Sequence, residues 1–191
     1  MTHFALGFRV KSGWAAAVLV SVSTDAPCLC ASEVIDLCDR REPATQQPYH
    51  AAMGKLETNG TKLKQRIESV RRATKQSIVD LRRRCAEGGY AVERAGLVVG
   101  SVIDPDSIAN PHVRAHALEG HLFRTTLEAA LQEQGIRSSI FRECDIFAAA
   151  TKSLGQSPAQ IKRALTHLGR SAKSSWRTEQ KLAALAAWLA L

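Results

Sequence analysis

The sequence has few aromatic residues and no pair of cysteines at the spacing of a metal site. Only 5% of its 191 residues are aromatic, which disfavours a protein that stacks many single-stranded bases on rings. The five cysteines are scattered and form no Cys-x-x-Cys motif, which argues against a zinc ribbon and is typical of reduced cytosolic thiols. Cys28 and Cys30 would share one face of a strand, where we expect them to pack.

The sequence also lacks low-complexity tracts and long apolar runs. The runs Trp14–Val22 and Leu182–Leu191 are shorter than the roughly 18 apolar residues that cross a bilayer. The first run is also a poor secretory signal, because Asp25 and Pro27 fall where cleavage would occur. With 45% hydrophobic and 23% charged residues, we expect one cytoplasmic domain over 1–191, with no membrane partner. A homodimer is one assembly that the sequence allows.

Acidic residues are outnumbered by basic ones. Lysine and arginine total 26 and aspartate and glutamate total 18, a formal charge of +8, which favours an acidic partner such as nucleic acid. Most of the excess lies on a predicted helix over 60–87, which could contact phosphates without reading base sequence. The alternative is an ordinary solvent-exposed helix face. The candidate phosphate-binding residues of this helix are Arg71, Arg72, Arg82, Arg83 and Arg84.

Hydrophobic periodicity predicts three strands at the start of the chain and alternating helices and strands after them. Three β-rich segments separated by turns predict an antiparallel meander. Apolar residues at three- and four-residue steps then predict the long helix, which ends at a pair of glycines. A short apolar run after it is typical of a buried parallel strand. The predicted strands are 4–10, 14–22, 29–37, 97–103 and 138–141, and the predicted helices are 60–87, 113–134, 158–168 and 178–191.

Three segments of the chain can be compared with the sequence pattern of a known family. Residues 6–15 read Leu-Gly-Phe-Arg-Val-Lys-Ser-Gly-Trp-Ala, Ala115–Gly135 is a predicted helix that ends at glycine before a strand, and Thr178–Leu191 contains Ala-Ala-Leu-Ala. In these segments, and in its order of elements, the chain resembles the Holliday-junction resolvase (RuvC-like) branch of the ribonuclease H-like superfamily. The resemblance implies an α/β fold with a mixed five-stranded sheet flanked by helices. Parts of the last two segments, 115–124 and 179–188, also resemble uncharacterised bacterial proteins, which implies no activity.

The chain departs from that family where the family's chemistry resides. Resolvase carboxylates on the first strand, the fourth strand and the last helix hold two metal ions about 4 Å apart. The matching positions hold Arg9 (or Phe8, if the register slips), the segment 98–101 without a glutamate, and Ala183. Because an arginine cannot ligate magnesium, we expect no two-metal nuclease activity and assign no metal and no cofactor. Arg9 and Lys11 instead suit an anion site or an ordinary basic turn.

A second constellation lies on the predicted helix over 113–134 and the residue before it. His112, His116 and Glu119 are spaced i, i+4 and i+7, which places them in one stripe inside the apolar arc of the helix. A carboxylate in such an arc needs a partner or a proton. The arrangement suits a structural hydrogen bond, an acid–base pair or a pair of metal ligands. Glu119 and His116 are therefore candidate catalytic residues.

The last helix and the loop after the fourth strand supply further candidates. Glu179 and Lys181 open the last helix, which the family resemblance places at the active edge of the sheet. Glu179 is then a catalytic candidate and Lys181 an anion-binding one. Asp104 and Asp106 follow the predicted strand 97–103, where ligands bind in open α/β sheets, although helix capping would also explain them.

Three functions remain open from the sequence. The first is a ribonuclease H-like domain that binds nucleic acid without two-metal nuclease activity. The second is an enzyme of different chemistry that uses a His/Glu pocket on a small or phosphorylated substrate. The third is a structural or partner-binding protein. The position of the basic helix relative to the cleft discriminates the first from the others.

Overall fold

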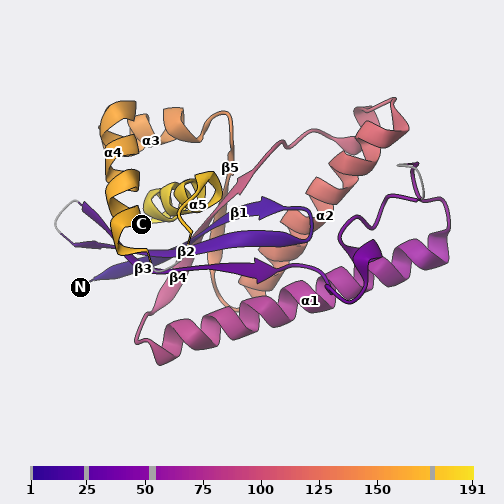
Figure 1. Ribbon diagram of the computed structural model, residues 1–191, viewed down its shortest axis with the longest axis horizontal. Coiled ribbons are helices and arrows are strands. Elements are labelled where there is room, and N and C mark those ends of the chain that lie inside the picture. The colour runs from indigo at the N-terminus through magenta and orange to yellow at the C-terminus, as the bar shows by residue number, and fades with distance from the viewer. Residues whose placement is uncertain (1, 24–25, 52–54, 173–174) are drawn as a thin grey trace.

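The computed structural model describes residues 2–23, 26–51, 55–172 and 175–191, and within them five strands form one mixed sheet (Figure 1). The strands are β1 (His3–Lys11), β2 (Trp14–Ser23), β3 (Ala26–Asp36), β4 (Val92–Val99) and β5 (Arg137–Arg142). β1 and β3 are antiparallel to β2, whereas β4 is parallel to β1 and β5 to β4, in the order β3-β2-β1-β4-β5. The predicted mixed five-stranded sheet is confirmed.

Helices cover both faces of this sheet (Figure 1). One face packs against α1 (Gly60–Glu87) and α2 (Pro111–Glu133), and the other packs against α5 (Thr178–Ala190). Beside α5 lie α3 (Ile146–Leu154) and α4 (Pro158–Leu168). Short 3-10 segments are η1 (Pro43–Thr45), η3 (Pro105–Ser107) and η4 (Gly169–Ser171).

Alternation along β1 sends successive side chains into two different cores. Phe8 and Val10 belong to the core beneath α1 and α2. Arg9 pairs with Ala16 across the β1–β2 ladder, and Ala16 belongs to the core beneath α5. Arg9, and not Phe8, is therefore the residue at the end of β1 that shares the face covered by the last helix.

Two glycines let α5 lie directly on the sheet. A Cβ atom on Gly7 of β1 would stand 1.8 Å from the carbonyl oxygen of Ala183, and one on Gly96 of β4 would stand 2.2 Å from that of Ala186. Any side chain at either strand position would push the helix away. Ala183 is fully buried in this contact, where its carbonyl group lies against the backbone of Gly7.

The predicted elements differ from the structure at two places. The helix α3 was missed, because nine residues are too few to display a helical period clearly. The fourth strand covers Val92–Val99 and not 97–103: its first residues include exposed polar side chains, so a search for apolar runs missed them. Residues 100–103 leave the sheet beyond its edge. Of the helices in the described part of the chain, none is both long and apolar enough to cross a membrane.

Candidate functional site: a cationic cleft beside a histidine cluster

A cleft of about 290 Å³ opens where β1 and β4 end. Its walls are the end of β1, the segment after β4 and the N-terminal half of α2. This edge, beyond the carboxyl ends of parallel strands, is where α/β sheets bind ligands. Among the described residues that line the cleft there is no aspartate or glutamate, and the ionisable ones are Arg9, Lys11, His116, His121 and Arg124.

Arg9 forms the floor of the cleft and is held rigidly. Its side chain is 4% exposed, and its guanidinium forms an ion pair with the carboxylate of Glu143, which is 43% exposed. The same guanidinium donates to the carbonyl oxygens of Val10, at 2.8 Å, and Val98, at 3.4 Å. Glu143 lies just after β5, and its own N–H donates to the carbonyl of Val99 at 2.9 Å. The end of β1 therefore holds a buried, paired arginine at the floor of the cleft.

The other cleft cations differ in how far they are neutralised. Arg124 lies 3.5 Å from the carboxylate of Glu128, one turn along α2. Lys11 is half-buried at the end of β1 and has no acidic partner within the described part of the chain. Lys11 is thus the cleft cation whose charge is most available to an anion.

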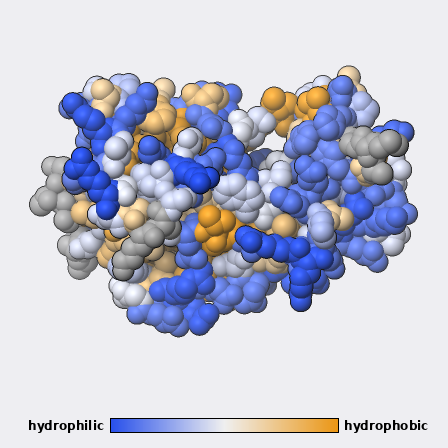
Figure 2. Space-filling model, viewed as in Figure 1, coloured by the Kyte–Doolittle hydropathy of each residue, from blue (hydrophilic) through white to orange (hydrophobic). Residues whose placement is uncertain are grey.

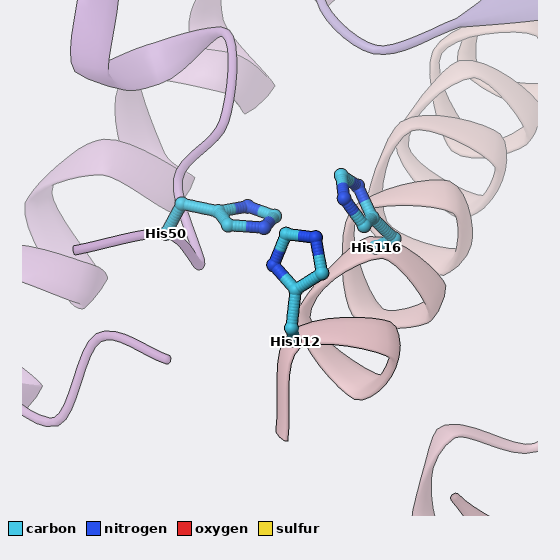
Figure 3. A group of neighbouring side chains, drawn as sticks. All are labelled: His50, His112 and His116. Carbon is cyan, nitrogen blue, oxygen red and sulfur yellow. The ribbon is translucent and has the colours of Figure 1, made fainter. Parts of the chain in front are cut away.

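A cluster of three imidazoles adjoins the cleft (Figure 3). His50 comes from the loop before α1, whereas His112 and His116 stand one turn apart at the start of α2. The ring centroids lie 4.4 Å apart for His50 and His116, 4.6 Å for His112 and His116, and 5.2 Å for His50 and His112. One ring nitrogen from each histidine lies within 4.8 Å of the other two. His116 also lines the cleft.

Glu119 lies behind this cluster and is fully buried. Its Oε1 and the Nδ1 of His50 are 2.7 Å apart and share a hydrogen bond. Its Oε2 lies 3.6 Å from the Nδ1 of His116, beyond hydrogen-bond distance. Burial raises the pKa of Glu119 above its ordinary value, and the hydrogen bond to His50 offsets part of that rise. In the described structure, the buried Nε2 of His50 has no hydrogen-bond partner.

The pKa of His116 is shifted in the opposite sense. Partial burial lowers it below its ordinary value, and repulsion from His50 and His112 lowers it further. Its side chain is 49% exposed, so the ring is open to the cleft, and the lowered pKa favours its neutral form. A neutral imidazole has one nitrogen lone pair that can accept a proton or bind a metal.

The predicted stripe on α2 is only partly buried. Glu119 lies inside the core, whereas His112 and His116 are exposed, because the first turns of the helix extend past the sheet. Full burial prevents Glu119 from contacting a substrate, so it can act only through the histidines. Asp104 accepts a hydrogen bond from the N–H of Asp106 and caps η3, as the capping interpretation predicts.

The candidates on α5 do not join the cleft. Neither Glu179 nor Lys181 is among the residues that line it. Lys181 instead lines a separate pocket with Phe147 of α3 and Lys162 of α4. The direct contact of α5 with the sheet is made by its middle, at Ala183 and beyond, while its first turn faces these helices.

The predicted basic helix also stands apart from the cleft, so its charge gives no support to nucleic-acid binding at this site. None of its five candidate arginines lines it. Arg83 lies 3.2 Å from Asp80, and Arg84 lies 2.7 Å from Glu33 of β3. Arg71 and Arg72 line a groove between α1 and α2. Figure 2 shows hydrophilic side chains over much of the face that carries α1, as expected for a solvent-exposed helix.

Sequence reasoning missed two residues of the site, His50 and Glu143. His50 lies in a loop far along the chain from α2, and Glu143 lies in the turn between β5 and a helix that was not predicted. No spacing rule connects either residue to its partner. The one available signal was the predicted burial of Glu119, which requires a hydrogen-bond partner, but the histidines of the same helix were candidates for that partner.

Comparison with known proteins identifies the fold. No protein-family model and no curated protein matches the chain. Solved structures do, and they show that this is a ribonuclease H-like fold. In particular, the chain is similar to Thermus thermophilus RuvC in complex with Holliday junction substrate, with TM-score 0.60 and 11% identity over 98% of this chain and 92% of that one. A second Thermus thermophilus RuvC structure matches with TM-score 0.54 and 12% identity over 97% and 92% of the two chains.

Proposed function

We propose that the chain is a ribonuclease H-like domain that binds nucleic acid through the cationic cleft and does not cleave it by the two-metal mechanism. The observation that carries the proposal is the cleft itself. It lies at the edge of the sheet where the resolvase family holds metal-binding carboxylates, yet its described lining includes Arg9, Lys11 and Arg124 and no acidic residue. The similarity to a RuvC that is in complex with a Holliday junction substrate supports nucleic acid as the ligand.

The chemistry of the cleft suits phosphate. A guanidinium offers parallel N–H donors and a lysine ammonium offers a compact charge, and both bind phosphate oxygens. Arg9 is held by two carbonyls and by Glu143, so its charge is already paired. We therefore assign contact with phosphate to Lys11 and Arg124.

The same residues disfavour two-metal catalysis. Magnesium takes oxygen ligands in octahedral geometry, and a buried guanidinium would repel the ion. Ala183, at the family's last-helix position, is buried against the backbone of Gly7, so no ligand replaces the lost carboxylate there. The active site is therefore degenerate under this proposal.

The binding proposal is tested with a four-way DNA junction and a linear duplex at several salt concentrations. Replacing Lys11 with glutamine should weaken binding and reduce the log–log salt slope by about 0.9 if one phosphate contact is lost. Arg124→Gln should add to the effect. The control is Arg82→Gln/Arg83→Gln/Arg84→Gln, three changes on α1 that leave the cleft intact.

The two surfaces give opposite outcomes. If the α1 triple variant flattens the slope while Lys11→Gln does not, α1 is the binding surface and the cleft proposal is wrong. Absence of any measurable binding to either DNA at low salt would remove the proposal altogether. The role of the α1 arginines stays a prediction that these measurements test. The homodimer also stays a prediction, which a sedimentation experiment tests.

The half-exposed His116 keeps one alternative open. It lines the cleft beside the cations, an arrangement that also suits acid–base chemistry on a small phosphorylated substrate. The fully buried Glu119 cannot be the second catalytic group of such an enzyme. A competition experiment distinguishes the two functions. If the cleft is the active site for a small phosphorylated substrate, that substrate should displace DNA at concentrations at which inorganic phosphate does not.

A further inference from the structure

We propose that His50, His112 and His116 bind one transition-metal ion of the Zn²⁺ class, and that Glu119 positions the ligands from behind. The three rings come from two separate segments of the chain and point toward one another (Figure 3). One nitrogen of each lies within 4.8 Å of the other two. This site is distinct from the carboxylate site of the resolvase family and independent of the nucleic-acid proposal.

The geometry is close to that of a metal-bound state. Zn–N bonds of about 2.0–2.1 Å in a tetrahedron place the ligand nitrogens roughly 3.4 Å apart. The imidazoles must therefore close by about an ångström, which side-chain rotation supplies. His112 and His116 are exposed and can turn toward His50 without repacking the core.

Glu119 determines which nitrogen of His50 faces the ion. Its carboxylate shares a hydrogen bond with Nδ1, at 2.7 Å, so Nε2 is the ring nitrogen that is left to face the ion. That Nε2 is buried and has no partner among the described residues. A buried nitrogen without a hydrogen bond is costly, and a bound ion would satisfy it.

The second oxygen of Glu119 extends this arrangement to His116. Oε2 has no hydrogen bond in the described structure and lies 3.6 Å from Nδ1 of His116. A small rotation of that ring would let both Nδ1–H groups donate to one carboxylate, with both Nε2 atoms directed at the ion. Carboxylates that orient metal-binding histidines in this way are the usual outer shell of zinc sites.

Hydrogen bonds hold the backbone of both segments that carry the histidines before any ion binds. Arg66 of α1 donates to the carbonyl oxygens of Pro48 and His50, at 3.0 and 3.1 Å, and lies 3.2 Å from the carboxylate of Glu57. These contacts hold the His50 backbone. On the other side, Asn110 accepts from the N–H of His112 and caps α2. Preorganised ligands lose less entropy on binding.

The ligand set selects the class of ion. Imidazole nitrogens suit Zn²⁺, Ni²⁺ and Cu²⁺, whereas Mg²⁺ and Ca²⁺ prefer oxygen. Three protein ligands leave one position of a tetrahedral ion open to water, the pattern of catalytic rather than structural zinc sites. Because His116 is also a wall of the cleft, the ion would add positive charge beside it.

Metal titration of the untagged full chain tests the proposal. The protein is treated with EDTA, desalted and titrated with ZnCl₂ in a calorimeter near neutral pH, with Co²⁺ as an optical probe. We expect one ion per chain in the micromolar range or tighter, and the visible spectrum of four-coordinate Co²⁺. Glu119→Gln should weaken binding by about 10–100-fold, and His112→Ala and His116→Ala should weaken it more.

Two controls address other ligands. His121→Ala removes an exposed histidine of the same helix that lies outside the cluster, and Cys28→Ser/Cys30→Ser/Cys144→Ser removes the thiols that are not buried. Both variants should bind Zn²⁺ as the wild type does. His112 and His116 are exposed, so circular dichroism should find their alanine variants folded even if a change at Glu119 is not tolerated. The proposal is overturned if the wild type binds no Zn²⁺ at micromolar concentrations, or if both alanine variants bind it unchanged.

Discussion

Under the proposed function, a single residue, Arg9, accounts for much of the difference between this cleft and a metal-dependent nuclease site. It occupies the face of β1 toward α5, is almost fully buried, and relies on Glu143 to balance its charge. Breaking such a pair from one side leaves a buried charge with only carbonyl partners, which costs more than the intact pair contributes. Glu143 is therefore a structural support of the cleft, although it does not line it.

Stability measurements test that role. Glu143→Gln should lower the free energy of unfolding by about 1–3 kcal/mol, the usual cost of removing one partner from a buried polar group. The matched control is Glu87→Gln, which removes an exposed partner of Arg83 that is 3.5 Å away and should change stability by less than about 1 kcal/mol. Urea unfolding measures both. Equal effects from the two variants would show that the buried position of Arg9 confers no special dependence on Glu143.

At the scale of elements, the fold depends on how closely α5 approaches the sheet. Gly7 and Gly96 present bare backbone to Ala183 and Ala186, so helix and strands meet without intervening side chains. The residues at this contact are therefore glycine and alanine. The contact also fixes the position of β1 relative to α5, and with it the position of Arg9, two residues after Gly7.

Glycine substitutions test this contact. Gly7→Ala would place a Cβ 1.8 Å from a carbonyl oxygen, and such overpacking costs about 1–3 kcal/mol or more. Gly120→Ala on α2 is the control, because no atom lies within 4 Å of its added Cβ; it should stabilise the protein by about 0.4–1 kcal/mol. Thermal unfolding should therefore shift in opposite directions. A neutral or stabilising Gly7→Ala would mean that α5 does not contact the sheet at this position.

The sequence predicts the elements better than it predicts the site. Alternation and helical periodicity predict the strands of the described sheet, with β4 displaced by several residues, and the helices α1, α2, α4 and α5, since these patterns are local. They also place His116 and Glu119 together. They cannot supply His50, whose position beside α2 is set by the folded loop and its contacts with Arg66. The predicted proximity of Glu179 to the same edge likewise depended on the path of the last helix, which no local pattern specifies.

At the scale of the whole molecule, the basic excess is divided between two regions. The arginines of α1 lie outside the cleft, and several of them have carboxylates nearby, as Arg83 and Arg84 do. The cleft contains fewer cations but no acidic residue in its described lining. Net charge alone therefore overstates the importance of α1. The excess of basic over acidic residues in the cleft at the edge of the sheet supports the proposed function.

The most direct test of the account is a cleavage assay on a bound four-way DNA junction. EDTA-treated, desalted protein is brought to saturation with labelled junction, and Mg²⁺ or Mn²⁺ is then added. Because the resemblance to the resolvase family implies that Arg9 and Ala183 replace two of its carboxylates, we expect a retained complex and uncut strands with either metal. Junction cleavage that requires the added metal, is abolished by EDTA and co-purifies with the wild-type protein would contradict it.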